Sequence, residues 1–236
     1  MSFGRPARPR GEPRTEAPVA GGRITAIESQ AHDPERVNVF LDGAFGFGLG
    51  AMLSVDEGLR IGDEVTAERA LELRAKDEVG KATTAALALL ARRPRSRREV
   101  ADRLKQKGYG AGAIEAALEK LAGWRYVDDA QFARFWVENR EAHKPRGKRL
   151  LEQELRFKGV DRELVRETIA AAELDEAAAA TELARAKLRS YAGLDPAVAR
   201  RRLGSFLARR GYGFDVVKPV LDQVLGEADD EIGDGS

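Results

Sequence analysis

Apolar residues recur at helical spacing through the last two thirds of the chain, and one pattern occurs three times. Its anchors are Gly108, Gly159 and Gly211, which lie 51 and 52 residues apart. Counted from each glycine, positions −8, −4, +6 and +10 are apolar: Val100, Leu104, Ile114 and Leu118, then Leu151, Leu155, Val165 and Ile169, then Leu203, Leu207, Val217 and Leu221. Spacings of four residues place each pair on one helical face. The sequence therefore predicts three divergent copies of one helical unit.

Helix start and stop signals agree with this repeat. Each anchor glycine follows Lys or Arg, the expected order at the C-terminal end of a helix. Ser96 with Glu99 forms a capping box, Asp161 can cap its helix, and Asp195 precedes Pro196 as an N-cap precedes an N1 proline. A further helix is expected ahead of the middle helix of each copy, at residues 83–91, 129–142 and 176–190.

The stretch before the repeats alternates in the manner of β-strands. We expect strands at residues 23–28, 36–41 and 44–49, with Asp42-Gly43 supplying a type I′ turn. A short helix near residues 51–57 and a turn at Gly62-Asp63 follow. Thr66 can cap a helix that runs to about residue 79, and a continuation toward residue 91 stays open.

The predicted fold class is mainly α, with tandem three-helix repeats in an elongated array behind a small N-terminal antiparallel β-sheet head. One repeat has a small core and is marginal alone, so stacked neighbours are expected to complete it. The expected boundaries are 1–22 for a disordered Arg/Pro-rich tail, 23–80 for the head, 81–126, 127–174 and 175–226 for the repeats, and 227–236 for an acidic disordered tail.

Composition narrows the class of protein. The chain has no cysteine and no apolar run long enough for a membrane span, so we expect a soluble, cytoplasmic protein with no membrane contact. We also expect a monomer. Its net charge of +1 conceals an asymmetry, because residues 23–80 carry 6 basic and 12 acidic side chains while residues 81–226 carry 30 basic and 20 acidic ones. The basic repeats predict a polyanionic or acidic partner.

Cations recur at fixed positions of the middle helix. They occupy position −11 (Arg97, Lys148, Arg200), position −10 (Arg98, Arg149, Arg201) and position −1 (Lys107, Lys158, Arg210), and Arg95 and Arg146 extend the first two clusters together with Arg92, Arg93 and Lys144. Cations in the first turn oppose the helix macrodipole, so their recurrence indicates a use. A solvated charged face remains the alternative.

Features that resemble catalytic sites have simpler explanations. The glycines of residues 46–50 fit no phosphate-binding motif and are expected in a strand or hairpin. Asp128-Asp129 stands where a helix must start, so capping is favoured over acid–base or Mg²⁺ chemistry. His32 and His143 are isolated. We therefore expect no enzyme activity, no cofactor and no metal.

The third helix of each copy is poorly equipped to read base edges. Residues 111–122 offer Glu115, Glu119 and Lys120, and the third copy runs Phe-Asp-Val-Val-Lys-Pro-Val-Leu from Phe214. Neither segment carries the Arg, Asn and Gln set of a sequence-reading helix. Contact with a nucleic-acid backbone and contact with an acidic protein groove both stay open.

Short motifs follow one another in a fixed order over residues 22–226. They are Arg36-Val-Asn-Val-Phe-Leu-Asp-Gly43 with Phe45-Gly-Phe47, then Arg95-Ser96-x-x-Glu99-Val100-x-x-x-Leu104-x-x-Lys107-Gly108, then Tyr126-Val-Asp-Asp129-x-x-Phe132-Ala133 leading to Arg140 and Gly147, and finally Glu154-Leu155-x-x-Lys158-Gly159-Val160. In order and spacing these motifs resemble the RecX family, bacterial regulatory proteins of the RecA recombinase. The first pair resembles the β-rich head of longer members, the next motif is similar to the family's first module, and the last two are similar to the start and end of its second module. The third module is the most diverged.

The resemblance implies a mainly inhibitory regulator that binds the RecA–DNA filament and modulates strand exchange, ATP hydrolysis and co-protease activity in DNA repair and the SOS response. Successive modules would contact successive protomers, which yields avidity. We expect the cations at positions −11, −10 and −1, with Arg95 and Arg146, to contact acidic RecA surface or DNA phosphates. The alternative is a sequence-nonspecific DNA-binding protein that acts by competition for DNA.

Overall fold

The computed structural model describes residues 21–233, and it describes side chains as far as residue 227. The predicted N-terminal tail lies outside this range, apart from its last two residues. Contacts divide the chain into two compact units, residues 1–82 and 83–236.

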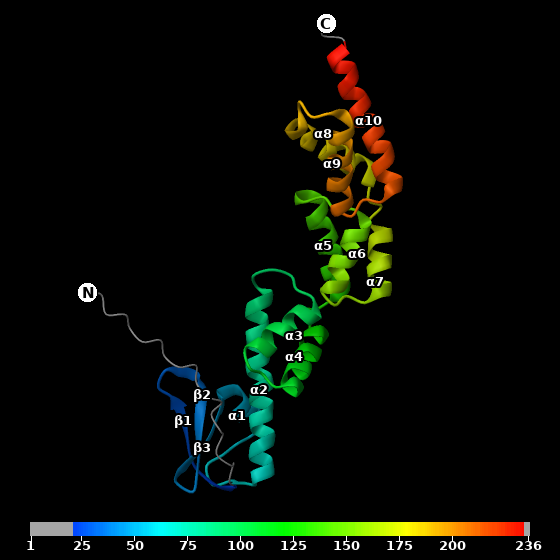
Figure 1. Ribbon diagram of the computed structural model, residues 1–236. Coiled ribbons are helices and arrows are strands. Elements are labelled where there is room, and N and C mark those ends of the chain that lie inside the picture. Colours follow the sequence, from blue (N-terminus) through cyan, green and yellow to red (C-terminus); the bar gives the residue numbers. More distant parts are fainter. Residues whose placement is uncertain (1–20, 234–236) are drawn as a thin grey trace, which may run out of the picture. The chain divides into compact units, whose positions relative to one another are not determined.

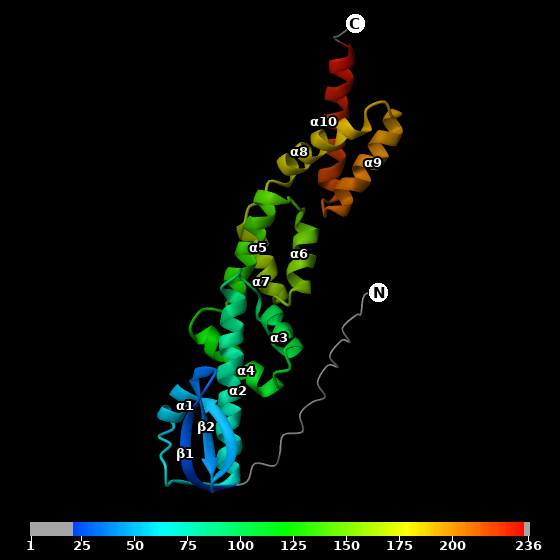
Figure 2. The same ribbon diagram turned by 90° about the vertical axis from the view of Figure 1, so that its left-hand side faces the viewer.

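The first unit is built on a curled antiparallel sheet (Figures 1 and 2). The strands are β1 (Gly22–Gln30), β2 (Asp33–Leu41), β3 (Ala44–Gly50) and β4 (Glu64–Val65), in the order β3-β2-β1-β4. Asp42 and Gly43 have φ values of 48° and 83°, the positive φ at both positions that a type I′ turn requires. The antiparallel sheet is confirmed. The two-residue strand β4 was not predicted, because it is too short to leave a periodic pattern.

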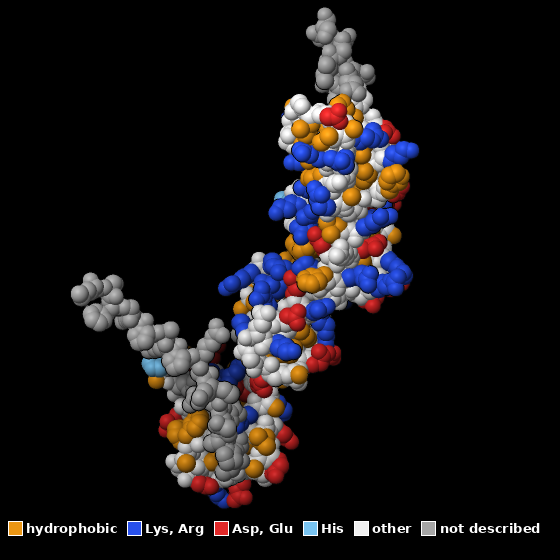
Figure 3. Space-filling model, in the orientation of Figure 1, with side chains coloured by type: hydrophobic (Ala, Val, Ile, Leu, Met, Phe, Trp, Pro, Cys, Tyr) orange, Lys and Arg blue, Asp and Glu red, His pale blue; other side chains and the backbone are white. Residues whose placement is uncertain are grey.

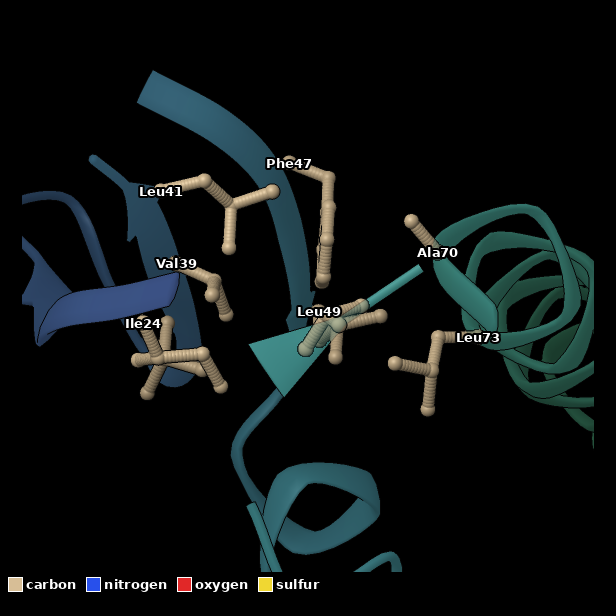
Figure 4. Close-up of a cluster of buried hydrophobic side chains, with 9 residues drawn as sticks. Ile24, Val39, Leu41, Phe47, Leu49, Ala70 and Leu73 are labelled. Carbon is tan, nitrogen blue, oxygen red and sulfur yellow. The ribbon is translucent and has the colours of Figure 1, made fainter. Parts of the chain in front are cut away.

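One face of this sheet is covered by helix. Ile24, Val39 and Leu49 from the strands pack against Ala70 and Leu73 from α2 (Ala67–Leu90), and all are at most 1% exposed (Figure 4). The short helix α1 (Ala51–Asp56) follows β3 directly. The glycines of residues 46–50 lie in β3, as we expected of a strand.

Helix α2 continues past residue 79, the point at which the sequence left its end open. It is one helix of 24 residues, and the hydroxyl of Thr66 accepts a hydrogen bond from Arg69 N at 3.1 Å. Buried apolar positions continue along it through Ala82 and Ala86, and no Pro interrupts it. The helix that we expected ahead of the first middle helix is therefore the last part of α2.

The second unit contains the three repeats. The first adds α3 (Arg97–Gln106) and α4 (Ala111–Gly123) to the end of α2, and the second contains α5 (Asp129–His143), α6 (Lys148–Phe157) and α7 (Arg162–Ala171). The third contains α8 (Glu176–Leu188), a 3₁₀ turn at Arg189–Tyr191, α9 (Pro196–Arg209) and α10 (Phe214–Gly233). All twelve residues at positions −8, −4, +6 and +10 are buried, so the repeat pattern is confirmed as a core pattern.

The middle helices α3, α6 and α9 end in the same way. The anchor glycines have φ values of 91°, 85° and 92°, a conformation that costs glycine little. Each glycine N–H and the N–H that follows it donate back to carbonyls of the last helical turn, the pattern of a Schellman motif. The predicted caps also hold: Ser96 and Glu99 form the capping box, and Asp161 and Asp195 accept from their first turns.

The acidic C-terminal segment differs from expectation. We predicted disorder from residue 227, whereas α10 continues to Gly233. Glu227 pairs with Arg185 of α8 at 2.8 Å, which fixes α10 beyond Val224, the last buried residue among the described side chains. Residues 234–236 lie outside the described range.

Candidate partner-binding surface

The first two middle helices meet end to end. Ser96, the fully buried N-cap of α3, donates its hydroxyl to the carbonyl of Lys158, the C-cap of α6, at 2.6 Å. Glu99 of α3 receives a hydrogen bond from Lys158 Nζ at 2.8 Å. The N–H of Arg97 donates to Asp129 of α5 at 2.8 Å. The N-terminus of α3 is thus capped partly by the second repeat.

The same junction recurs between the second and third repeats. Gly147, the N-cap of α6, donates its N–H to the carbonyl of Arg210, the C-cap of α9, at 2.9 Å. The N–H of Lys148 donates to Glu176 of α8 at 2.8 Å. Asp129 and Glu176 are both the first residue of their helix and cap the middle helix of the repeat before. The repeat thus preserves a junction as well as a core.

The junctions change the interpretation of the N-terminal cations. We expected positions −11 and −10 to be unfavourable, because cations there face the positive end of their own helix dipole. In the structure the negative end of the next middle helix abuts that positive end, so the two partial charges offset each other. A Cβ on Gly159 would lie 2.5 Å from Arg98 Cδ, which shows that the Arg98 stem covers the end of α6.

The cations at position −11 form ion pairs with acidic residues of the same chain. Arg97 pairs with Glu115 and, at 3.2 Å, with Glu119 of α4. Arg200 pairs with Asp222 of α10, which occupies the same position as Glu119 in its repeat. Lys148 lies 4.0 Å from Glu176. These pairs join two helices, so position −11 has a structural role independent of any partner.

The cations at position −1 have a different environment in each of the three repeats. Lys158 is only 15% exposed, and its Nζ lies 4.1 Å from the ring centre of Trp136 as well as on Glu99. Arg210 lies over Phe206, with 4.8 Å from Cζ to the ring centre. Lys107 is exposed and pairs with no other described residue. Lys107 is therefore the most accessible member of this set.

Position −10 is exposed in all three repeats, which is true of neither position −11 nor position −1. Arg98, Arg149 and Arg201 are exposed. Arg98 has one pair, Asp102 at 3.9 Å within its own helix, whereas Arg149 and Arg201 pair with no described residue. A cation with no intramolecular partner is free to meet an anion from outside. This position therefore best fits a repeated binding surface.

The flanking arginines have internal contacts. Arg95 Nε donates to the carbonyl of Leu89 at 3.2 Å, and burial lowers the pKa of its guanidinium. Arg146 Nε lies 3.8 Å from Glu154, which also accepts from Arg140 and Trp136 at 2.7 and 2.9 Å. Both arginines are half-buried. Arg95 therefore ties the loop before α3 to α2, whereas Arg146 makes only a long ion pair, since its buried Nε has no hydrogen-bond partner among the described residues.

Sequence reasoning missed two exposed aromatic residues beside these cations. A hollow of about 810 Å³ between α6, α9 and the start of α10 is lined by Arg149, Arg201 and Phe214. A second hollow of about 460 Å³ shares Arg149 and Gln153 with it and extends to Phe157. We call the two together the α6–α9 groove. Phe157 and Phe214 are 81% and 77% exposed. The sequence could have revealed both residues, since neither aromatic falls on an apolar position of the repeat, and such residues are not required by the core.

Charge is distributed unevenly over the drawn face. Lys and Arg side chains gather over the helical repeats, and Asp and Glu side chains border the sheet unit (Figure 3). This agrees with the charges of +10 and −6 for residues 81–226 and 23–80, counted as 30 minus 20 and 6 minus 12. The repeats thus present the surface that an anionic partner would meet.

The features that resemble catalytic sites have structural roles. Asp128 caps α5 by accepting from Ala130 and Gln131 at 2.8 and 2.9 Å, and Asp129 caps α3 instead of its own helix. Burial raises the pKa of Asp129 despite the hydrogen bond from Arg97. His143 contacts the carbonyl of Asn139 at 3.1 Å. Within the described side chains, no three His, Asp or Glu residues are grouped as metal ligands.

No helix among the described residues combines the length and apolarity of a membrane span.

Several curated proteins with similar sequences share one description. A protein from Bacillus licheniformis described as "Regulatory protein RecX" is 34% identical over 208 residues, which cover 88% of this chain and 79% of the relative. The chain belongs to the RecX family. A Clostridium botulinum member is 31% identical over 86% of this chain and 96% of its own length, and a Streptomyces lividans member is 36% identical over 67% and 87%.

Models of the RecX domains match in chain order. The RecX N-terminal domain matches residues 22–66, and the first, second and third RecX three-helix domains match residues 82–121, 128–169 and 174–221. A crystal structure of regulatory protein RecX superposes with a TM-score of 0.71 at 23% identity, covering 85% of this chain and 98% of that one. RecX from Lactobacillus salivarius superposes with a TM-score of 0.57 at 20% identity, over 63% and 97%. The RecX fold is therefore shown for the described residues.

Proposed function

We propose that this RecX-family chain is a cytoplasmic, monomeric regulator that binds the RecA–DNA filament and mainly inhibits it. It modulates recombinase, ATPase and co-protease activity in DNA repair and the SOS response. Membership of a family whose curated members are described as regulatory proteins supports the regulatory role. The chain acts by binding, and any ATP hydrolysis is that of RecA.

The observation that carries the proposal is the recurrence of one exposed arginine in a repeated frame. Arg98, Arg149 and Arg201 hold the same position, and the two end-to-end junctions fix successive middle helices relative to each other. A partner that is itself a repeating polymer can meet the same cation several times. Several weak contacts linked in one chain give avidity that one repeat lacks.

Charge reversal at position −10 tests the proposal. The variant Arg98→Glu, Arg149→Glu, Arg201→Glu is expected to lose most inhibition of RecA ATPase on single-stranded DNA, because acidic RecA surface or DNA phosphates would face anions. These side chains are exposed, so circular dichroism should show unchanged helicity. Undiminished inhibition by the triple variant would contradict the role of this position.

A matched control separates position from net charge. The variant Arg134→Glu, Arg162→Glu, Lys218→Glu makes the same change in charge at exposed residues of α5, α7 and α10. It is expected to retain inhibition. If both triple variants lose inhibition equally, the effect is one of net charge, and the repeated surface is not the determinant.

The second candidate function is competition with RecA for DNA. The basic α6–α9 groove favours it, because a surface rich in arginine attracts a DNA backbone without sequence selectivity. Competition predicts similar affinity for bare DNA and for RecA filaments at matched salt. A filament-directed regulator binds the filament more tightly, so titration against both targets discriminates the two functions.

A further inference from the structure

The α6–α9 groove has an unusual balance of charge. Five arginines line its two hollows, Arg149, Arg156, Arg200, Arg201 and Arg209, against a single acid, Glu152. Arg200 is neutralised by Asp222, and the other four arginines have no ion pair with a described residue. Unpaired like charges gathered on one surface repel one another, so the arrangement is unfavourable unless an anion lies there.

The two exposed phenylalanines of the groove are not explained by the repeat. Phe157 stands at position −2, where the other copies have Gln106 and Arg209, and Phe214 stands at position +3, where they have Ala111 and Arg162. The rings contribute to neither core cluster of their repeats. A large apolar ring left in water gives up the free energy of burial, so the pair has no evident role in stability.

Cations and exposed rings on one groove fit one class of ligand closely. Proteins that bind single-stranded nucleic acid combine a basic groove along the backbone with aromatic side chains on which bases stack. The groove has four unpaired guanidinium groups for phosphates, two rings for bases and Gln153 as an uncharged hydrogen-bonding group between the two hollows. Every base has a π-face, so no helix that reads base edges is needed.

We propose that the α6–α9 groove is a binding site for single-stranded nucleic acid, in which Phe157 and Phe214 each stack an unpaired base while Arg149, Arg156, Arg201 and Arg209 contact phosphates. The site belongs to this chain alone and operates without RecA. Arg149 and Arg201 also belong to the proposed regulatory surface, whereas Phe157 and Phe214 do not. The phenylalanine variants, measured without RecA, therefore test this site separately from the regulatory function.

Stacking distinguishes this ligand from other polyanions. In duplex DNA the bases are stacked on each other and shield their faces, so a duplex satisfies only the arginines. An acidic protein segment likewise supplies charge without flat rings. Both are expected to bind more weakly than a single strand of equal charge, and the weaker complexes should dissociate more completely as salt is raised.

The test measures binding of the full chain to labelled oligo(dT) by fluorescence anisotropy, in the absence of RecA. Phe157→Leu and Phe214→Leu are each expected to lower affinity about tenfold with an unchanged salt slope, because Leu retains an apolar side chain but cannot stack. Arg149→Gln should lower affinity and also reduce the slope of log K against log salt by about 0.7, the value for one phosphate contact on a single strand.

Matched controls are present in the same chain. Phe45→Leu alters an exposed phenylalanine of the sheet unit, and Arg134→Gln removes an exposed charge outside the groove. Both should bind oligo(dT) as the unaltered chain does. The unaltered chain, compared on oligo(dT) and on an abasic strand of equal length, provides a measurement that does not depend on any variant folding.

Three results would overturn the proposal. Equal affinity for abasic strand and oligo(dT) would exclude stacking. Binding of polyglutamate as tight as that of oligo(dT) would identify the groove as a site for acidic protein. If Phe45→Leu lowers the affinity for oligo(dT) as much as Phe157→Leu does, the rings of the groove make no specific contribution to binding. The proposal is supported if the chain binds oligo(dT) more tightly than the abasic strand and polyglutamate, and if only the groove variants weaken that binding.

Discussion

Glu99 combines three contacts in one side chain. It closes the capping box of α3 with Ser96, pairs with Arg93 and accepts from Lys158 across the first junction. Burial opposes its ionisation, but the hydrogen bonds from Arg93 and Lys158 prevail and hold the pKa of Glu99 at about 2. A residue that the sequence marks as a cap therefore also joins two repeats.

This pKa predicts how stability depends on pH. Because the folded pKa lies below the ordinary value near 4.5, ionised Glu99 stabilises the fold above pH 4.5, and the contribution is lost as pH falls toward 2. Glu99→Gln keeps the capping box, since Gln also serves at N3, and removes only the charge. We expect it to lower the free energy of unfolding by ~1–3 kcal/mol at neutral pH.

Chemical denaturation at several pH values checks this prediction. The difference between the unaltered chain and Glu99→Gln should shrink steadily from pH 4.5 to pH 2. A difference that stays constant over that interval would show that the charge of Glu99 is not coupled to Lys158 and Arg93.

At the scale of elements, adjacent aspartates are predicted to support different helices. Asp128 caps α5, whereas Asp129 caps α3 from the neighbouring repeat. Asp128→Ala should destabilise the first turn of α5, and Asp129→Ala the first turn of α3, each by ~1 kcal/mol. Hydrogen exchange read by mass spectrometry locates the loss. Faster exchange at α5 alone in both variants would contradict the cap between repeats.

The second junction depends on a close approach of two backbones. A Cβ on Gly147 would collide with the carbonyl group of Gly211, so the glycine permits the hydrogen bond from Gly147 N to Arg210 O. Gly147→Ala is expected to separate the ends of α6 and α9 and to cost ~1–3 kcal/mol of stability. Thermal unfolding measures the loss.

The control for this variant is Gly80→Ala in α2. A Cβ on Gly80 meets nothing within 4 Å, and the residue lies inside a helix. Alanine there should stabilise the chain by ~0.5–1 kcal/mol because it restricts the unfolded state and favours the helix. Equal effects of the two substitutions would show that the junction tolerates a side chain.

At the scale of the whole molecule, the junctions predict that damage spreads from one repeat to its neighbour. Leu207→Ala removes a fully buried side chain of the third core and should cost ~2–5 kcal/mol locally. The end of α9 that caps α6 then unfolds more often, so α6 loses its cap for a larger fraction of the time. Repeat proteins transmit stability through such neighbour contacts.

Hydrogen exchange tests this spreading. Protection should fall in α9 and α10 and also at the start of α6, while β2 in the sheet unit keeps its protection because it belongs to a separate core. Loss confined to the third repeat would mean that the junctions do not couple the repeats.

The sequence by itself determined the repeat. Positions −8, −4, +6 and +10, the anchor glycines and the caps all act within one helix or one helix pair, where spacing along the chain fixes spacing in space. For the same reason the three long strands and the Asp42-Gly43 turn were predictable. The family resemblance could be read because these local signals occur in a fixed order.

Only the tertiary structure decided which cations are available to a partner. Arg97, Arg98 and Lys158 look alike in sequence, yet Arg97 pairs with α4, Lys158 lies on Trp136 and Glu99, and Arg98 remains exposed. Their partners lie up to 59 residues away along the chain, at separations that periodicity does not encode. The end-to-end junctions and the α6–α9 groove arise from the same long-range packing, because neither exists until separate repeats meet.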